Sequence, residues 1–299
     1  MAASGTPEMS PALRIRHFTD PACPWAFSAE PARLALRWLY GDALGWEDRM
    51  VVLSSSPEEY LAKGFTPGKL STGLRTLQRR FDMPIDPRER PRMAASEPAC
   101  RAVVAVRLRA PGDAEALLRR LRVLTMAGGL LDDPELIARA AREAGLDPAE
   151  LGRWSGEPDV EEALAEDMRL ARAPDDAALA LEHKLAEAAE AERGHRYTCP
   201  SCEIERVSDG ERVTVPGFQP LAAYEVAVAN LAPELERHPA PESAAEALDW
   251  AGMPLAAVEV AALCQINLDE AREQLARVAR EEPVGTEGWW ELTGAPAPA

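Results

Sequence analysis

Cys23 is the residue of this sequence best placed to do chemistry, because it lies between an expected strand and an expected helix. Residues 13–18 alternate in polarity as a strand does, and Pro24 is typical of the first turn of a helix. The unpaired N–H groups of a helix N-terminus favour negative charge and lower the pKa of a thiol below its free value of about 8.5. The sequence therefore predicts a nucleophilic thiolate at Cys23.

Two further cysteines, Cys199 and Cys202, form a Cys-x-x-Cys motif on an expected strand. Side chains alternate along a strand, so these two thiols are expected to face opposite ways rather than form one clip. Thiolates suit Zn²⁺ or an iron–sulfur cluster, and Cys23 is a third candidate ligand. A fourth ligand is not evident, with His17 and His195 the nearest in sequence. We therefore predict no metal, and Cys202 is expected to lie in the core.

Composition and charge limit the classes of partner. The 299 residues are 46% hydrophobic, and 50 acidic against 33 basic residues give a formal charge of −17. This balance argues against nucleic acid and anionic membranes, which bind cationic surfaces. Five scattered cysteines do not make a disulfide scaffold. With no apolar run long enough to cross a bilayer and no recognisable secretion signal, we expect a cytoplasmic protein.

The order of the expected elements indicates an α/β unit with helices inserted between its halves. The apolar patterns predict the following sequence of elements: strand 13–18, helix 24–40, strand 46–53, a helical block over 57–192 without strands, a strand near 197–204, a turn at 208–211, strand 212–215 and helix 219–231.

The chain beyond residue 239 is expected to form a separate acidic module. Three expected helices (244–251, 255–264 and 268–280) and a ribbon-like tail over 281–290 suggest a winged-helix shape. Residues 241–299 carry eleven acidic residues and three arginines, so a protein-contact or lid module is favoured over a DNA reader. The predicted domains are 1–56 with 195–238, the helical insertion 57–194, and the C-terminal module 239–299.

The segment from Asp20 to Phe27 resembles the active-site turn of the DsbA-like branch of the thioredoxin superfamily. Around Pro200, Thr198-Cys199-Pro200-Ser201 resembles the cis-proline loop of that family, and Gly217-Phe218-Gln219-Pro220 resembles the segment before its last helix. The resemblance covers about residues 12–235 and implies a thioredoxin fold with a helical insertion domain. Pro216 is an alternative cis-proline, although its position after the expected hairpin favours Pro200.

The chain departs from the family at Ala26, which stands where the family has its second active-site cysteine. A dithiol enzyme uses that cysteine to release its mixed-disulfide partner. Three outcomes stay open for a mixed disulfide on Cys23. A low-molecular-weight thiol resolves it, Cys199 resolves it, or the site does not turn over. Relatives of similar build use such thiols, so the resemblance implies mycothiol or glutathione as co-substrate, with no tightly bound cofactor.

Two functions follow from the resemblance. The first is a thiol-dependent oxidoreductase or transferase acting on a disulfide or an electrophile. The predicted site residues are Cys23, Pro24, Trp25, Ala26, Cys199 and Pro200 for catalysis, with Arg193, Arg196 and Thr198 for the small thiol. The second is a non-catalytic adaptor for a cytosolic protease, since Ala29-Glu30-Pro31 resembles a turn of such adaptors, with the C-terminal module binding a protein partner. Glu30 is expected at the surface, and His17 is expected to be structural.

Overall fold

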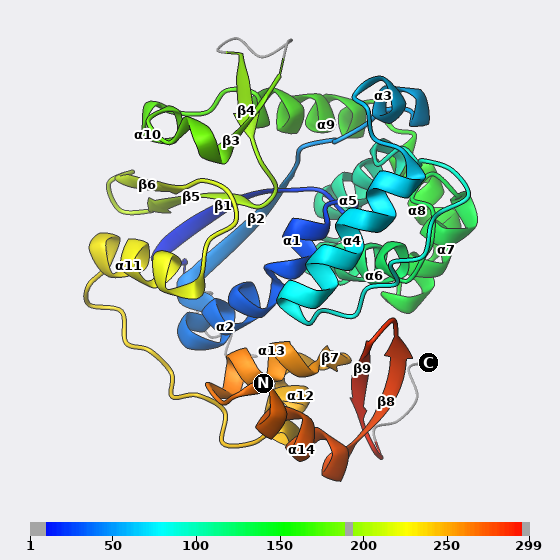
Figure 1. Ribbon diagram of the computed structural model, residues 1–299. Coiled ribbons are helices and arrows are strands. Elements are labelled where there is room, and N and C mark those ends of the chain that lie inside the picture. The colour runs from blue at the N-terminus through cyan, green and yellow to red at the C-terminus, as the bar shows by residue number, and fades with distance from the viewer. Residues whose placement is uncertain (1–9, 189–193, 295–299) are drawn as a thin grey trace, which may run out of the picture.

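A four-stranded sheet forms the centre of the computed structural model, which describes residues 10–188 and 194–294 (Figure 1). The strand order is β2-β1-β5-β6, with β1 and β2 parallel and the other neighbours antiparallel. The strands span β1 Leu13–Thr19, β2 Leu44–Met50, β5 Ser201–Arg206 and β6 Arg212–Val215. The turn between β5 and β6 lies where the sequence predicts it, with Gly210 at a φ of 78°.

Helices cover both faces of this sheet. Leu13 and Ile15 alternate to one face of β1, where they pack against α2 (Glu30–Tyr40) and α11 (Leu221–Leu231). Phe18 points to the other face and packs with Ala171 at the end of α9. Apolar side chains on both faces of β1 are thus buried, whereas the outer strands β2 and β6 are largely only partly buried.

The helix that follows Cys23 has a break that the sequence patterns do not indicate. It forms as α1 (Pro24–Ser28) and α2, separated at Ala29. Pro31 lies in the first turn of α2, where a missing N–H costs nothing, so it favours a new start there. Val52 adopts a φ of 54° just beyond β2, which ends the strand earlier than the expected residue 53.

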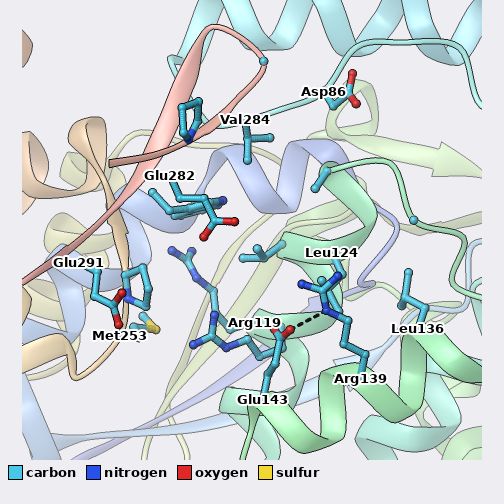
Figure 2. A pocket seen from close by; sticks show the side chains of 18 of the residues that line it. Asp86, Arg119, Leu124, Leu136, Arg139, Glu143, Met253, Glu282, Val284 and Glu291 are labelled. Atoms are coloured by element: carbon cyan, nitrogen blue, oxygen red, sulfur yellow. Dashed lines mark hydrogen bonds and ion pairs between the residues drawn. The ribbon is translucent and has the colours of Figure 1, made fainter. Parts of the chain in front are cut away.

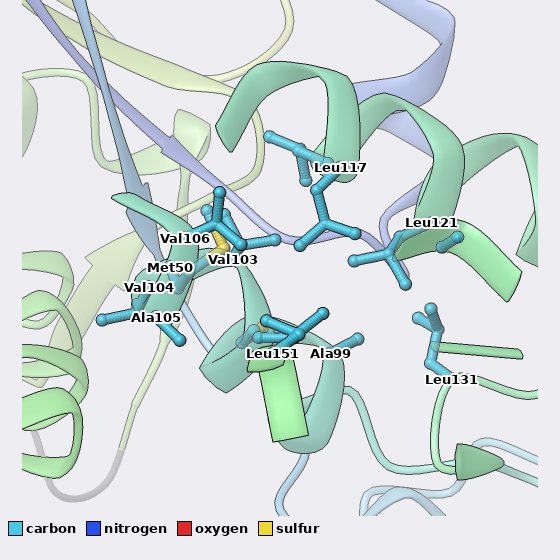
Figure 3. Packing of buried hydrophobic residues seen from close by; sticks show 14 of the residues in the cluster. Met50, Ala99, Val103, Val104, Ala105, Val106, Leu117, Leu121, Leu131 and Leu151 are labelled. Carbon is cyan, nitrogen blue, oxygen red and sulfur yellow. The ribbon is translucent and has the colours of Figure 1, made fainter. Parts of the chain in front are cut away.

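The helical block between β2 and β4 has its own core, centred on α5 (Figure 3). Residues 99, 100 and 102–106 of α5 are all buried, because neighbouring helices surround it. The helices of the block are α3 Pro57–Ala62, α4 Pro67–Phe81, α5 Glu97–Arg109, α6 Ala114–Met126, α7 Pro134–Glu143, α8 Pro148–Ser155, α9 Pro158–Ala171 and α10 Asp176–Leu179.

The end of this block contains a strand, contrary to the sequence prediction. β3 (Leu185–Glu187) pairs antiparallel with β4 (His195–Tyr197). The expected strand near 197–204 is accordingly two strands, β4 and β5, separated by Pro200, which cannot donate to a strand ladder.

The C-terminal segment consists of three helices and a small sheet of order β7-β9-β8. Its elements are α12 Ala244–Ala251, β7 Leu255–Ala256, α13 Ala257–Cys264, α14 Leu268–Val278, β8 Ala279–Val284 and β9 Glu287–Leu292. The β8–β9 hairpin begins two residues earlier than the expected tail. Leu34 of α2 joins the apolar cluster of this segment, so the segment packs directly on the helix that follows the active-site turn.

In the described part of the chain, no helix combines the length and apolar character needed to cross a membrane.

Candidate active site

Cys23 lies at the N-cap of α1, in a turn that Asp20 holds in place. The Cys23 backbone N–H donates to the carbonyl oxygen of Asp20 at 3.1 Å. The Asp20 carboxylate accepts from the backbone N–H groups of Ala22 (2.7 Å) and Leu53 (2.8 Å) and from the Ser96 hydroxyl (2.8 Å). These contacts join β1, the end of β2 and the start of α5, so that the turn has one conformation.

The cis-proline loop lies against the Cys23 thiol. The Cys199–Pro200 peptide bond is cis. The Cys23 Sγ donates to the Cys199 carbonyl oxygen at 3.2 Å, and both cysteines belong to one buried cluster. Cys202 lies instead between the sheet and α11, in a separate cluster. The structure thus brings together two of the three cysteines of the active-site region, although 176 residues separate them.

The two neighbouring thiols have opposite acidities. A hydrogen bond with the Cys199 thiol lowers the pKa of Cys23, and the backbone N–H groups of Ala26 and Trp25 act in the same direction against burial and the Asp20 charge. Burial and the neighbouring Cys23 raise the pKa of Cys199 well above its ordinary value. Cys23 is therefore the more acidic thiol of the pair, and Cys199 the less acidic one.

Asp20 is a site residue that the sequence analysis missed. Its side chain is fully buried, and burial raises its pKa even though four groups donate to it, the Cys100 thiol (3.4 Å) included. Its negative charge opposes ionisation of Cys23. The signal was present in the Asp-Pro pair three residues before Cys23, because aspartate at such a turn often accepts from nearby backbone N–H groups.

Ala26, in place of the expected second cysteine, lines a small cavity of about 20 Å³ behind the active-site turn. His17 and Arg33 line the same space. Burial lowers the pKa of His17 despite the opposing hydrogen bond between its Nδ1 and Asp48 Oδ1 (2.7 Å). His17 is thus a neutral, partnered side chain, as a structural histidine would be.

Trp25 is on the solvent side of the motif. The residue is 40% exposed, and its ring makes edge contacts with Phe81 (centroids 5.7 Å apart) and Phe218 (5.6 Å). This aromatic group joins the active-site turn, the end of α4 and the segment before α11. It forms one wall beside Cys23, which is itself only 6% exposed.

The turn opens onto a cavity of about 920 Å³, which we call the active-site cavity. Cys23, Pro24 and Trp25 line one side, and α3, α4 and residues 90–94 line much of the rest. This volume is typical of sites for small molecules. Most of the lining side chains come from the helical insertion, so that insertion completes the site around the cysteine.

The three residues predicted to bind a small thiol have different positions. Arg196 lines the active-site cavity. The Thr198 hydroxyl donates to the carbonyl oxygen of Lys184 at 2.7 Å and supports the loop. Arg193 lies outside the described residues.

Glu30 corrects a prediction, because it is 1% exposed rather than at the surface. Its carboxylate pairs with Arg122 and lies 3.5 Å from Arg119 and 3.7 Å from Arg33. Arg119 also forms a bidentate pair with Glu259 (2.6 and 2.7 Å). These ion pairs join α2, α6 and α13 beneath the active-site helix.

A second cavity, of about 790 Å³, lies between the helical insertion and the C-terminal segment. Figure 2 shows Arg139 paired with Glu143 on one side and Glu282 and Glu291 on the other. Six acidic and four basic side chains line this cavity. Cysteines are not among them, so its chemistry differs from that of the active-site cavity.

Within residues 10–188 and 194–294, no group of three His, Cys, Asp or Glu side chains is arranged to hold a metal ion. The two clusters that separate Cys199 from Cys202 explain why the cysteines of the motif form no such group.

Comparisons with solved structures identify the fold. The cytosolic disulfide reductase DsbM from Pseudomonas aeruginosa is similar at a TM-score of 0.52 and 19% identity, over 73% of this chain and 100% of that chain. A probable DsbA oxidoreductase from Streptomyces coelicolor is similar at 0.51 and 17% identity, over 74% of this chain and 91% of that chain. No protein-family model and no curated protein sequence matches.

The chain has the DsbA-like thioredoxin fold. The α/β class and the helical insertion predicted from the sequence are confirmed. About a quarter of the chain has no counterpart in DsbM, which is itself matched over its whole length.

Proposed function

We propose that the protein is a thiol-dependent oxidoreductase or transferase in which Cys23 is the single motif nucleophile. The observation that supports this most directly is the contact between Cys23 and the cis-proline loop at the edge of an open cavity. Hydrogen bonds lower the pKa of Cys23, so its reactive thiolate is present at lower pH than that of an ordinary cysteine. A cytoplasmic location is part of this proposal, in keeping with the similarity to the cytosolic reductase DsbM.

In the proposed reaction with a disulfide, the Cys23 thiolate attacks one sulfur. A mixed disulfide with Cys23 forms, and the other half of the substrate leaves as a thiolate. A small thiol such as mycothiol or glutathione then attacks the Cys23 sulfur of the mixed disulfide, which releases the second substrate thiol and leaves the small thiol bound to Cys23. A second small thiol attacks the sulfur of that bound small thiol, forms the small-thiol disulfide and regenerates the Cys23 thiolate. The sum is one substrate disulfide reduced to two thiols, with two small thiols oxidised to their disulfide.

Cys199 is the internal alternative for resolution. Its thiolate would attack the Cys23 Sγ, release the substrate thiol and leave a Cys23–Cys199 disulfide, which an external thiol must reduce. The charge of the Cys23 thiolate helps to raise the pKa of Cys199 in the resting state. Formation of the mixed disulfide removes that charge and so makes Cys199 easier to ionise when it is needed.

The adaptor hypothesis finds less support, because Glu30 is occupied in buried ion pairs and is not available to a partner. The division of the chain into three domains, with the C-terminal module as a protein-binding part, stays a proposal.

The pH dependence of Cys23 alkylation tests the proposed function. Iodoacetamide labelling followed by peptide mass spectrometry should show a Cys23 rate that saturates well below pH 8.5. A second digest is prepared from unlabelled protein after reaction with one equivalent of a disulfide in the presence of the small thiol. It should contain either a small-thiol adduct at Cys23 or a disulfide-linked Cys23–Cys199 peptide. A Cys23 that titrates like an ordinary thiol would refute the proposal. Cys264, in the apolar cluster of the C-terminal segment, is the internal control.

A further inference from the structure

The active-site cavity is positively charged in a strongly negative protein. Six basic side chains and two acidic ones line it, whereas the whole chain has a formal charge of −17. The basic side chains are Lys63, Lys69, Arg90, Arg92, Arg172 and Arg196, and the acidic ones are Glu59 and Glu187. Such a concentration of one sign in a cleft attracts ligands of the opposite sign.

Some of these cations already have carboxylate partners. Lys63 pairs with Glu59 at 2.5 Å, and Arg92 makes two hydrogen bonds with Asp132, at 2.6 and 2.8 Å. Lys69, Arg90 and Arg196 form no ion pair within 4 Å in the part of the chain that the structure describes. They donate to backbone carbonyl oxygens instead. Lys69 donates to that of Gly64, and Arg196 to that of Tyr197. Arg90 donates to those of Arg88, Thr125 and Met126.

Arg90 is the most informative of the three, because it is only 7% exposed. Its Nη1 donates to the Arg88 carbonyl at 2.9 Å and its Nη2 to the Thr125 carbonyl at 3.1 Å. Burial lowers its pKa, which reflects the cost of a charge removed from water. Buried arginines are normally paired with an acid for this reason. The Asp86 carboxylate partly offsets this cost without forming an ion pair with Arg90, and an anion in the cavity would supply the direct partner.

The rest of the cavity is largely apolar. Leu53, Leu70, Leu74, Leu77, Met93 and Leu131 are among its lining side chains. These aliphatic groups suit the carbon skeleton of a ligand, while the cations suit an acidic group on it. Cys23 is 6% exposed beside this space, so a slender molecule can bring a sulfur or carbon atom to it more readily than the surface of a folded protein can.

We propose that the active-site cavity binds a small organic anion with an apolar body, held by Arg90, Lys69 and Arg196. If the proposed function holds, on which this part of the inference rests, the anion is the disulfide or electrophilic substrate of Cys23. Protein disulfides are then poor substrates.

Binding is tested without turnover in the Cys23→Ser protein, with two fluorescent probes that differ by one sulfonate. 8-Anilinonaphthalene-1-sulfonate carries the anionic group, and N-phenyl-1-naphthylamine lacks it. We expect the sulfonate to bind at least about tenfold more tightly. Lys69→Gln with Arg196→Gln should remove most of this preference and leave the affinity for the neutral probe within about twofold. Equal affinity for both probes would overturn the proposal.

Three further variants locate the probe and guard against misfolding. Gly73 lines the cavity, and a Cβ added there meets no atom within 4 Å, so Gly73→Trp should fill the space and abolish binding of both probes. Arg90→Gln should reduce the sulfonate preference and Arg90→Lys should restore part of it, with circular dichroism unchanged. Unaltered sulfonate binding in Gly73→Trp would place the probe elsewhere and refute the site.

Reaction of the wild-type protein separates this inference from the proposed function. The dianion 5,5′-dithiobis(2-nitrobenzoate) and the neutral 4,4′-dithiodipyridine both react with thiolates, and mass spectrometry assigns the reaction to Cys23. Lys69→Gln with Arg196→Gln should slow the dianion several-fold more than the neutral reagent. If the double substitution slows both reagents equally, the proposal that the substrate of Cys23 is an anion is contradicted. A Cys23 that reacts with neither reagent, with sulfonate binding intact, contradicts the proposed function alone.

Discussion

The two large cavities of this protein are similar in volume but opposite in charge. The active-site cavity has six basic against two acidic side chains, and the second cavity has four basic against six acidic ones. Buried arginines show the same contrast. Arg119, on the second cavity, is 4% exposed and pairs with Glu259. Arg90, on the first, is 7% exposed, and its hydrogen bonds within the described residues go to carbonyl oxygens.

The difference in ion-pair partners indicates different roles for the two arginines. Arg119 joins α6 to α13 through an ion pair that is complete within the chain, and its guanidinium also stacks over the Trp289 ring at 4.8 Å. It therefore serves the packing of the C-terminal segment. Arg90 lines the same cavity as Cys23, and although the Asp86 charge acts on it, it forms no ion pair within 4 Å among the described residues, which is the arrangement expected of a site for an anion.

Breaking the Arg119 pair should have the largest effect. Glu259→Gln removes the closer, bidentate carboxylate from a buried guanidinium, leaves only Glu30 at 3.5 Å, and should lower the free energy of unfolding by about 3–5 kcal/mol. Urea denaturation measures this. Glu135→Gln is the matched control, because Glu135 forms a solvent-exposed pair with Arg142 and should change stability by less than about 0.5 kcal/mol. A Glu259→Gln protein as stable as the wild type would contradict a stabilising role for the Arg119–Glu259 ion pair.

Arg90→Gln should cost less stability than Glu259→Gln. It removes hydrogen bonds to buried carbonyl oxygens, worth about 1–2 kcal/mol, but it strands no charged partner. The same denaturation experiment compares the two variants directly. If Arg90→Gln were the more destabilising, Arg90 would have to be regarded as a structural residue, and the contrast between the cavities would disappear.

Cys199→Ala should have a smaller effect, on the acidity of Cys23. The Cys199 thiol lowers the pKa of Cys23 by hydrogen bonding, so its removal raises that pKa and reduces the thiolate present at neutral pH. Alkylation of Cys23 at pH 7 should slow about 2- to 10-fold, the equivalent of one hydrogen bond, and its midpoint should move to higher pH. Cys202→Ala, in the separate cluster, should leave the profile unchanged. Faster alkylation of Cys23 in Cys199→Ala would contradict the role of the Cys199 thiol as a hydrogen-bond donor to Cys23.

Arg139→Gln in the second cavity should have the smallest effect. The Arg139 side chain is 61% exposed and pairs with Glu143, four residues along α7. Its loss should change stability by less than about 0.5 kcal/mol. The preference for a sulfonate probe should be the same as in the parent protein. A weaker preference for the sulfonate probe would show that its binding depends on the overall charge of the protein and not on the active-site cavity.

Local sequence patterns predicted the parts of the site that depend on neighbouring residues. The strand before Cys23, the helix after it and the Asp209-Gly210 turn follow from alternation, from proline in a first turn and from glycine in a left-handed conformation. The resemblance added the facing Pro200 loop. These features need only a few adjacent residues, so they can be found without the fold.

The tertiary structure alone decided which charged groups are buried and which are left without a partner. Glu30 was expected at the surface, yet Arg119 and Arg122, about ninety residues further along the chain, surround it. Arg90 stood out in no sequence pattern, because its importance depends on which acids lie near it in space. Burial and charge compensation come from contacts between distant segments, and the spacing of residues in one chain does not record them.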